Sequence, residues 1–281
     1  MPSPRTLLSA HDLRPRKQLG QNFLAHPGTA RMIVERARIG ADDRVLEIGP
    51  GLGALTIPLA EVAGAVVAVE KDRGLVPVLR QTLLAAGFER VVVREADILE
   101  CDLAAIAREA GGPLTVVGNL PYNISSQVVV RLIEARRDVT RAVLMFQREL
   151  AARLTATPGG RDYGRITAML SYCATVQRLA VVGAGAFYPA PQVDSEVIAI
   201  RFEPDRLYPP HDERHLFRVI ASAFGQRRKT LRNALAAGGL GLSTDAAEEA
   251  LRRAGIDPRR RAETLTPAEF VRIEIAVRCV R

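Results

Sequence analysis

The chain has 281 residues, of which 48% are hydrophobic and 25% are charged, the composition of an ordinary globular protein. It has no apolar run long enough to cross a bilayer, and its basic N-terminus lacks the apolar core of a secretion signal, so we expect a cytoplasmic protein with no membrane partner. The net charge of +8 is concentrated at the ends, since residues 1–40 and 201–281 each carry +5, and this distribution indicates a polyanionic partner.

The first two thirds of the chain alternate short apolar strands with helical segments. This pattern is typical of a parallel sheet that is covered on both faces. Strand segments are predicted at residues 43–51, 65–72, 90–99, 113–122 and 141–150. Helices are predicted between them at residues 56–64, 74–87, 102–112 and 125–136.

Two further apolar segments, 179–189 and 195–204, lie close together with prolines between them, which predicts an antiparallel pair at the end of the sheet. The chain then changes to short helical segments. They are predicted at residues 215–224, 227–237, 243–255 and 266–277. We therefore expect an α/β domain with a basic N-terminal extension at residues 1–205 and a small all-helical domain at residues 206–281.

Four successive predicted strands end in residues that suit a ligand. The first runs into Gly49 and Gly51, the second ends at Glu70, the third at Asp97 and the fourth at Asn119. Open α/β sheets bind ligands at the carboxyl ends of their strands. An acid about 20 residues after the glycine turn suits ribose hydroxyls, and a carboxylate at Asp97 can accept a hydrogen bond from an adenine amino group.

The glycine turn does not have the spacing of a dinucleotide site. It reads G-x-G-x-G with Pro50 inside it, whereas the pyrophosphate of NAD requires G-x-G-x-x-G. Glu47 lies just before the turn, and a carboxylate there disfavours a diphosphate. It favours a cationic ligand that has an amino acid end.

Several motifs together resemble one family. They are LGQNFL at residues 19–24, NLPY at residues 119–122, AFYPAPQVDS at residues 186–195 and FGQRRKTLRNAL at residues 224–235. With the glycine turn, they resemble class I S-adenosylmethionine-dependent methyltransferases, and more specifically the KsgA-type ribosomal RNA adenine dimethyltransferases, from about residue 16 to 272. The resemblance implies a Rossmann-like, mostly parallel seven-stranded sheet with a terminal antiparallel hairpin, plus a small helical domain.

The resemblance also implies an activity and a set of contacts. The cofactor is S-adenosylmethionine, and two methyl groups go to the exocyclic N6 of two adjacent adenosines near the 3′ end of small-subunit ribosomal RNA, in the pre-30S particle. We expect a monomer that acts in ribosome biogenesis. By resemblance, the cofactor-contacting residues are Asn22, Leu24, Gly49, Gly51, Glu70, Asp97 and Asn119.

The target base is expected at the NLPY turn. The Asn119 side-chain oxygen and the Leu120 carbonyl can accept the two N–H bonds of the adenine amino group, while Pro121 fixes the turn. Tyr122 is expected to stack on one face of the base and Phe187 on the other. A neutral amide is not a strong base, so the role of Asn119 is positioning and polarisation.

A cluster of basic residues is expected to contact RNA phosphates. A helix starting near residue 226 or 227 would carry Arg227, Arg228, Lys229 and Arg232 within about one turn. Cations at a helix start oppose the macrodipole, which favours an anionic partner. Internal salt bridges are the alternative interpretation.

Other functions remain open at this point. They are a macrolide-resistance-type methyltransferase of large-subunit ribosomal RNA, a non-catalytic assembly or transcription factor with the same fold, and an NAD-dependent dehydrogenase. No metal site is expected, because His211 and His215 lack a third ligand cluster. Three widely spaced cysteines favour reduced thiols.

Overall fold

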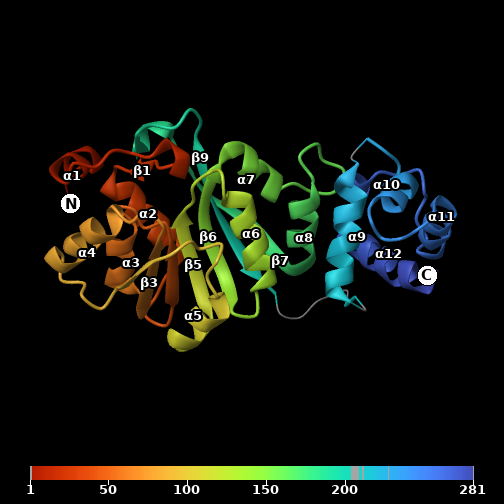
Figure 1. Cartoon of the computed structure of the whole chain (residues 1–281), viewed down its shortest axis with the longest axis horizontal. Helices are drawn as coiled ribbons and strands as arrows, with labels where there is room; N and C mark the ends of the chain where they lie inside the picture. Colours follow the sequence, from red (N-terminus) through yellow and green to blue (C-terminus); the bar gives the residue numbers. More distant parts are fainter. Residues whose placement is uncertain (1, 204–208, 211, 227, 281) are drawn as a thin grey trace. The chain divides into compact units, whose positions relative to one another are not determined.

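The computed structural model describes residues 2–203, 209–210, 212–226 and 228–280, which form two compact units (Figure 1). Unit 1 comprises Met1–Ala151 and Val176–Phe202, and unit 2 comprises Ala152–Thr175 and Glu203–Arg281. No helix of these described ranges is long and apolar enough to span a membrane.

A seven-stranded sheet, in the order β4-β3-β2-β5-β6-β9-β7, confirms the mostly parallel fold predicted from the sequence. The strands from β4 to β6 are parallel, and β9 is antiparallel to β6, with Met145 opposite Val197. Their bounds are β2 (Arg44–Ile48), β3 (Ala65–Glu70), β4 (Val92–Glu95), β5 (Leu114–Asn119), β6 (Val139–Gln147), β7 (Ala174–Val182) and β9 (Ser195–Phe202).

A second, two-stranded antiparallel sheet pairs β1 (Phe23–Leu24) with β8 (Phe187–Tyr188). It joins the N-terminal segment to the region before β9. The helices along this part of the chain are α1 (Pro4–Ala10), α2 (Pro27–Ala37), α3 (Thr56–Val62), α4 (Leu75–Ala85), α5 (Leu103–Glu109), α6 (Ser125–Glu134) and α7 (Arg148–Leu154).

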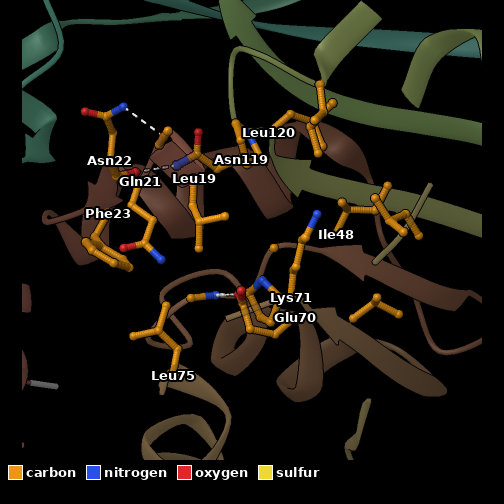
Figure 2. Close-up of a pocket in the computed structure, with 18 of the residues that line it drawn as sticks. Leu19, Gln21, Asn22, Phe23, Ile48, Glu70, Lys71, Leu75, Asn119 and Leu120 are labelled. Carbon is orange, nitrogen blue, oxygen red and sulfur yellow. Dashed lines mark hydrogen bonds between the residues drawn. The ribbon is translucent and has the colours of Figure 1, made fainter. Parts of the chain in front are cut away.

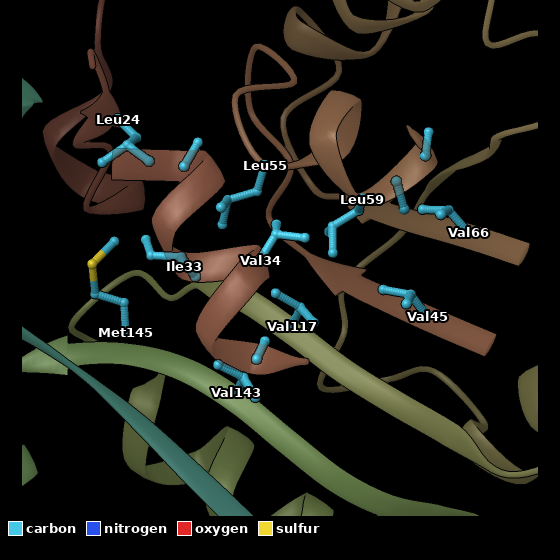
Figure 3. Close-up of a cluster of buried hydrophobic side chains, with 14 of the residues drawn as sticks. Leu24, Ile33, Val34, Val45, Leu55, Leu59, Val66, Val117, Val143 and Met145 are labelled. Atoms are coloured by element: carbon cyan, nitrogen blue, oxygen red, sulfur yellow. The ribbon is translucent and has the colours of Figure 1, made fainter. Parts of the chain in front are cut away.

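The core of unit 1 is a cluster of aliphatic side chains between the sheet and helices α2 to α4 (Figure 3). Alternate residues of the strands, including Val45, Val117 and Val143, contribute to this cluster, because successive side chains of a strand point to opposite faces. Leu46 and Ile48 are also fully buried, so the other face is covered as well. When both faces of a sheet are covered, polar side chains for a ligand can gather at the ends of its strands.

Unit 2 is helical and has an aromatic core. The ring centroids of Phe224 and Phe270 lie 5.9 Å apart, and those of Tyr163 and Phe224 lie 6.0 Å apart. Its helices are α8 (Arg165–Cys173), α9 (Glu213–Gly225), α10 (Leu231–Ala237), α11 (Thr244–Arg253) and α12 (Pro267–Cys279).

The division into units differs from the one proposed from the sequence. The boundary between residues 205 and 206 lies outside the described residues, but residues 152–175, which the sequence assigns to the first domain, belong to unit 2. The reason is packing: Tyr172 of α8 forms an edge-to-face contact with Phe217 of α9 at 6.0 Å. Sequence periodicity identifies a helix but does not say which core it joins.

The expected start of the helix that carries the basic cluster is also corrected. Residues 228–230 form a turn and an extended cap, and α10 begins only at Leu231. The Leu231 N–H donates to the Arg260 carbonyl at 2.8 Å and the Arg232 N–H to the Pro258 carbonyl at 3.2 Å. These tertiary hydrogen bonds satisfy the first amides of the helix, which a local sequence pattern cannot reveal.

Gly118 lies where β2 and β5 approach each other closely, near the carboxyl ends of both strands. A Cβ atom at this position would lie 2.7 Å from the Ile48 carbonyl oxygen, which belongs to the neighbouring strand and cannot move freely. We expect Gly118→Ala to destabilise the protein by ~1–3 kcal/mol, the usual cost of overpacking. Urea unfolding followed by circular dichroism measures this effect, with Gly28→Ala, where the Cβ meets nothing within 4 Å, as the control. Equal midpoints for the two variants would contradict the prediction.

Candidate active site

A pocket opens at the carboxyl ends of β2, β3 and β5 (Figure 2). The strand register explains why its residues meet, since Ile48 pairs with both Val69 and Gly118. The next residue of each strand therefore lies at the same edge. Of the residues predicted from the sequence, the pocket is lined by Asn22, Leu24, Gly49, Gly51, Glu70, Asp97, Asn119, Leu120, Pro121 and Tyr122.

The glycine turn is held by Glu70. Gly49 and Gly51 have φ values of +66° and +57°, a conformation that favours glycine. The Gly51 N–H donates to Glu70 Oε2 at 3.0 Å, and the Asp72 N–H donates to Oε1 at 2.8 Å. Burial raises the pKa of Glu70 above its ordinary value. A carboxylate oxygen can accept more than one hydrogen bond, so Glu70 in this orientation suits ligand hydroxyls.

Asp97 is ionised and oriented by its neighbours. Its Oδ2 lies 2.6 Å from Lys71 Nζ, and its Oδ1 accepts the Leu99 N–H at 3.0 Å. Burial acts to raise the pKa of Asp97, but the hydrogen bonds from Lys71 and Leu99 outweigh it and the pKa lies below its ordinary value. Lys71 lines the pocket beside Asp97, a neighbour that sequence analysis missed although it directly follows Glu70.

Glu47 is the least compensated carboxyl of the site. It lines the pocket, is 1% exposed, and its Oε2 has no hydrogen-bond partner in the part of the chain that the structure describes. Burial raises the pKa of Glu47 to about 8. A buried acceptor without a donor is costly, so this position suits a ligand that brings a positive charge or an N–H group.

The Asn119 amide has one defined orientation. Its Nδ2 donates to the Asn22 carbonyl at 2.8 Å, so its Oδ1 is left as the acceptor. Leu120, the next residue, is buried, and the Ser125 hydroxyl donates to the Pro121 carbonyl at 2.9 Å, which fixes the turn. The expected acceptor function of the Asn119 oxygen is therefore compatible with this geometry.

The two expected stacking rings lie in different environments. Tyr122 is half-buried, lines the pocket, and its hydroxyl forms a 3.1 Å hydrogen bond with Ser195 Oγ. Phe187 is 4% exposed and belongs to the aliphatic core of unit 1, where β8 pairs with β1. Phe187 does not line the pocket in this structure, and its expected stacking on the target base stays a prediction.

The basic cluster divides into free and paired side chains. Arg228 and Lys229 are exposed, and neither forms an ion pair within the described ranges. Arg232 instead lies 2.9 Å from Glu248 of α11, the internal salt bridge that was the alternative to phosphate contact. Arg227 lies outside the described residues.

No metal-binding cluster occurs among the residues that the structure describes, where no group of three or more His, Cys, Asp or Glu side chains converges. His215 instead lies 3.2 Å from Glu274 of α12, and His211 lies outside the described residues. Cys101, Cys173 and Cys279 carry reduced thiols.

Glu47 gives a pH dependence to stability. Because the pKa of Glu47 is about 8 in the folded protein, against an ordinary value of 4.5, the unfolded chain loses this proton first as the pH rises. Stability therefore falls between about pH 4.5 and 8, by an amount on the order of a few kcal/mol. We expect Glu47→Gln, which cannot ionise, to raise the melting temperature relative to wild type more at pH 8 than at pH 5.5.

Differential scanning fluorimetry at the two pH values tests this prediction. Glu61→Gln, which removes an exposed carboxyl from α3, is the control. A stabilisation by Glu47→Gln that is the same at both pH values would contradict the assignment.

Comparison with known proteins agrees with this geometry. Residues 13–278 match the family of ribosomal RNA adenine dimethylases. The chain is 50% identical over 277 residues to the ribosomal RNA small subunit methyltransferase A of Desulforapulum autotrophicum, an alignment that covers 99% of this chain and 97% of that protein.

A dimethyladenosine transferase from Plasmodium falciparum has a similar structure, with a TM-score of 0.74, 24% identity, and 89% and 95% of the two chains covered. So does the 23S rRNA methyltransferase ErmE, with a TM-score of 0.68, 27% identity, and 92% and 100% covered. The resemblance of the sequence motifs is confirmed, and the chain belongs to the ribosomal RNA adenine dimethylase family.

Proposed function

We propose that this protein uses S-adenosylmethionine to dimethylate the N6 of two adjacent adenosines near the 3′ end of small-subunit ribosomal RNA, on the pre-30S particle, during ribosome biogenesis. The observation that carries the proposal is the Asn119 amide, held with its oxygen free in a pocket whose wall contains Gly49, Glu70 and Asp97. The near full-length similarity to a small subunit methyltransferase supports the choice of RNA.

The residues of the pocket fit the cofactor. Glu70 would hold the ribose hydroxyls, Asp97 the adenine amino group, and the Gly49–Gly51 turn the methionine end. Glu47 supports this assignment, because its buried Oε2 has no hydrogen-bond partner among the described residues and the cofactor carries an ammonium and a sulfonium. Asn22 and Leu24 would cover the pocket from the N-terminal segment. When bound, the cofactor supplies an electrophilic methyl group with a good leaving group.

Asn119 and Leu120 would position the adenine amino group. The Asn119 oxygen and the Leu120 carbonyl accept its two N–H bonds, which favours a more pyramidal and more nucleophilic nitrogen. Orientation of the reacting groups is worth ~7–11 kcal/mol in favourable cases. The proton leaves to water after transfer, so no strong base is required from the protein.

We expect Tyr122 to stack on the target adenine once this base is flipped out of the RNA. Its hydroxyl is held by Ser195, so the ring has a fixed direction at the pocket. Stacking on one aromatic ring is worth ~1–3 kcal/mol, against an extrusion cost of a few kcal/mol. Stacking on Phe187, as expected from the sequence, and phosphate contacts would contribute the remainder.

The assigned reaction is tested first by transfer of labelled methyl groups to unmethylated small and large ribosomal subunits, followed by mass spectrometry of the nucleosides. We expect dimethyladenosine in the small subunit alone. Label only in large-subunit RNA would support the macrolide-resistance alternative. Label in neither subunit would support a non-catalytic assembly factor.

Asn119 is tested by substitution in the same assay. We expect Asn119→Ala to lower the transfer rate by at least about 100-fold, because the amino group loses an acceptor and its orientation. Cofactor affinity measured by calorimetry should change only modestly. Asn233→Ala, the same change at an exposed position of α10, is the control. Unchanged turnover by Asn119→Ala would refute the role.

Arg228 and Lys229 are proposed to contact phosphates. Replacing both by Ala should weaken RNA binding at low salt and lower the slope of log affinity against log salt by about one to two units. Filter binding at several salt concentrations measures the slope. The control replaces Arg252 and Arg253, which pair with Glu248 and Glu249 on α11. An unaltered slope would make the Arg228–Lys229 pair a solvated surface.

A further inference from the structure

One wall of the pocket is formed by a segment outside the Rossmann-like core. Residues 16–24, here termed the strap, lie between α1 and α2 and line the pocket from Gln18 to Leu24 (Figure 2). All of the strap belongs to unit 1. It contacts the ribose side of the pocket at one point and the target-base side at another.

On the ribose side, the strap is anchored on Asp72. This residue is 4% exposed, and its carboxylate accepts Gln21 Nε2 at 2.7 Å and the Gly74 N–H at 3.0 Å, while Arg16 Nη1 lies 3.1 Å away. The Arg16 N–H also donates to Gln21 Oε1 at 2.7 Å. The side chain of Gln21 therefore joins the strap backbone to Asp72, and the Asp72 N–H is bonded to Glu70.

On the target-base side, the strap holds the side chain of Asn119. The carbonyl of Asn22, a strap residue, accepts a hydrogen bond from Asn119 Nδ2, which leaves the Asn119 oxygen as the acceptor. Gly20, with φ +61°, lies so close to the NLPY turn that a Cβ atom would be 3.3 Å from Pro121 Cβ. Removal of the strap would leave the Asn119 amide free to turn and present its NH2 group to the base.

Between these two points, Phe23 fixes the height of the strap over the glycine turn. A Cβ atom on Gly51 would lie 3.1 Å from the Phe23 ring, so glycine allows the close approach. The ring also belongs to a cluster with Leu8 of α1 and Val78 of α4. The strap is thus a defined layer along one wall of the pocket, held at Asp72, at Asn119 and over the glycine turn.

We infer that Gln21, with Arg16, acts as a positioning residue that closes the strap on Asp72 and thereby keeps the Asn119 oxygen directed at the target base. The inference rests on the proposed function and links cofactor binding to positioning of the target base. Closure of the strap over the cofactor and orientation of the Asn119 oxygen are then one event. Gln21 contributes more than Arg16 to holding the strap on Asp72. The hydrogen bond of Gln21 is part-buried, whereas the Arg16 side chain is 57% exposed and its ion pair is screened by water.

The first experiment separates cofactor binding from transfer. For Gln21→Ala we expect weaker S-adenosylmethionine binding by calorimetry and a transfer rate that is lower by about tenfold or more at saturating cofactor and RNA. Arg16→Ala should show a smaller loss in both, and Arg16→Lys should recover much of it. Lys17→Ala, an exposed neighbour that has no ion pair within the described ranges, is the control. Melting temperatures near wild type exclude misfolding as the cause.

The second experiment needs no activity. Trypsin cleavage after Arg16 and Lys17, followed by mass spectrometry, reports how often the strap opens. We expect faster cleavage in Gln21→Ala than in wild type, with cleavage near Arg259 and Arg261 of unit 2 unchanged as an internal control. S-adenosylhomocysteine should slow strap cleavage in wild type. If Gln21→Ala leaves strap cleavage unaltered, or if it weakens cofactor binding with no loss of saturated rate, the inference is overturned. Absence of binding or transfer in wild type would instead refute the proposed function.

Discussion

The parallel register of β2 with β3 and β5 is the constraint on which the site depends. Because Ile48 pairs with Val69 and with Gly118, the residues that follow these pairs, Glu70 and Asn119, lie on either side of the glycine turn. The aliphatic side chains on the two faces of the sheet maintain this register, since a shift of one residue would move each of them to the opposite face and away from its packing partners. The chemistry at the edge is therefore a consequence of the core.

The site brings several buried or half-buried carboxyl groups together, and most of them have polar partners that offset the cost of burial. Backbone amides hold Glu70, an ammonium group holds Asp97, and the strap holds Asp72. Glu47 has no equivalent partner on its Oε2 in the described ranges, and its pKa of about 8 expresses that cost. A protein that accepts such a cost at a pocket gains a preference for a cationic ligand, which agrees with a sulfonium cofactor.

The basic side chains of the helical unit divide into a paired and an exposed group. Arg232 pairs with Glu248, and Arg260 pairs with Glu269 at 2.5 Å, so these side chains stabilise the contacts among α10, α11 and α12. Arg228 and Lys229 in the turn before α10 are left exposed. The proposed phosphate contact would use side chains of this second group, since phosphate contacts position RNA without reading its sequence.

The sequence by itself determined the class of fold, the family and most of the strand-end residues that line the pocket, because these depend on local patterns: strand periodicity, glycine spacing and the residues at strand ends. Tertiary structure alone decided four further points. Phe187 lies in the core because β8 pairs with β1, and residues 152–175 join the helical unit through Tyr172 and Phe217. The start of α10 depends on carbonyls of a distant loop, and the orientation of Asn119 depends on Asn22, 97 residues earlier in the chain. Each of these is a contact between segments far apart in sequence, and no periodicity within one segment contains that information.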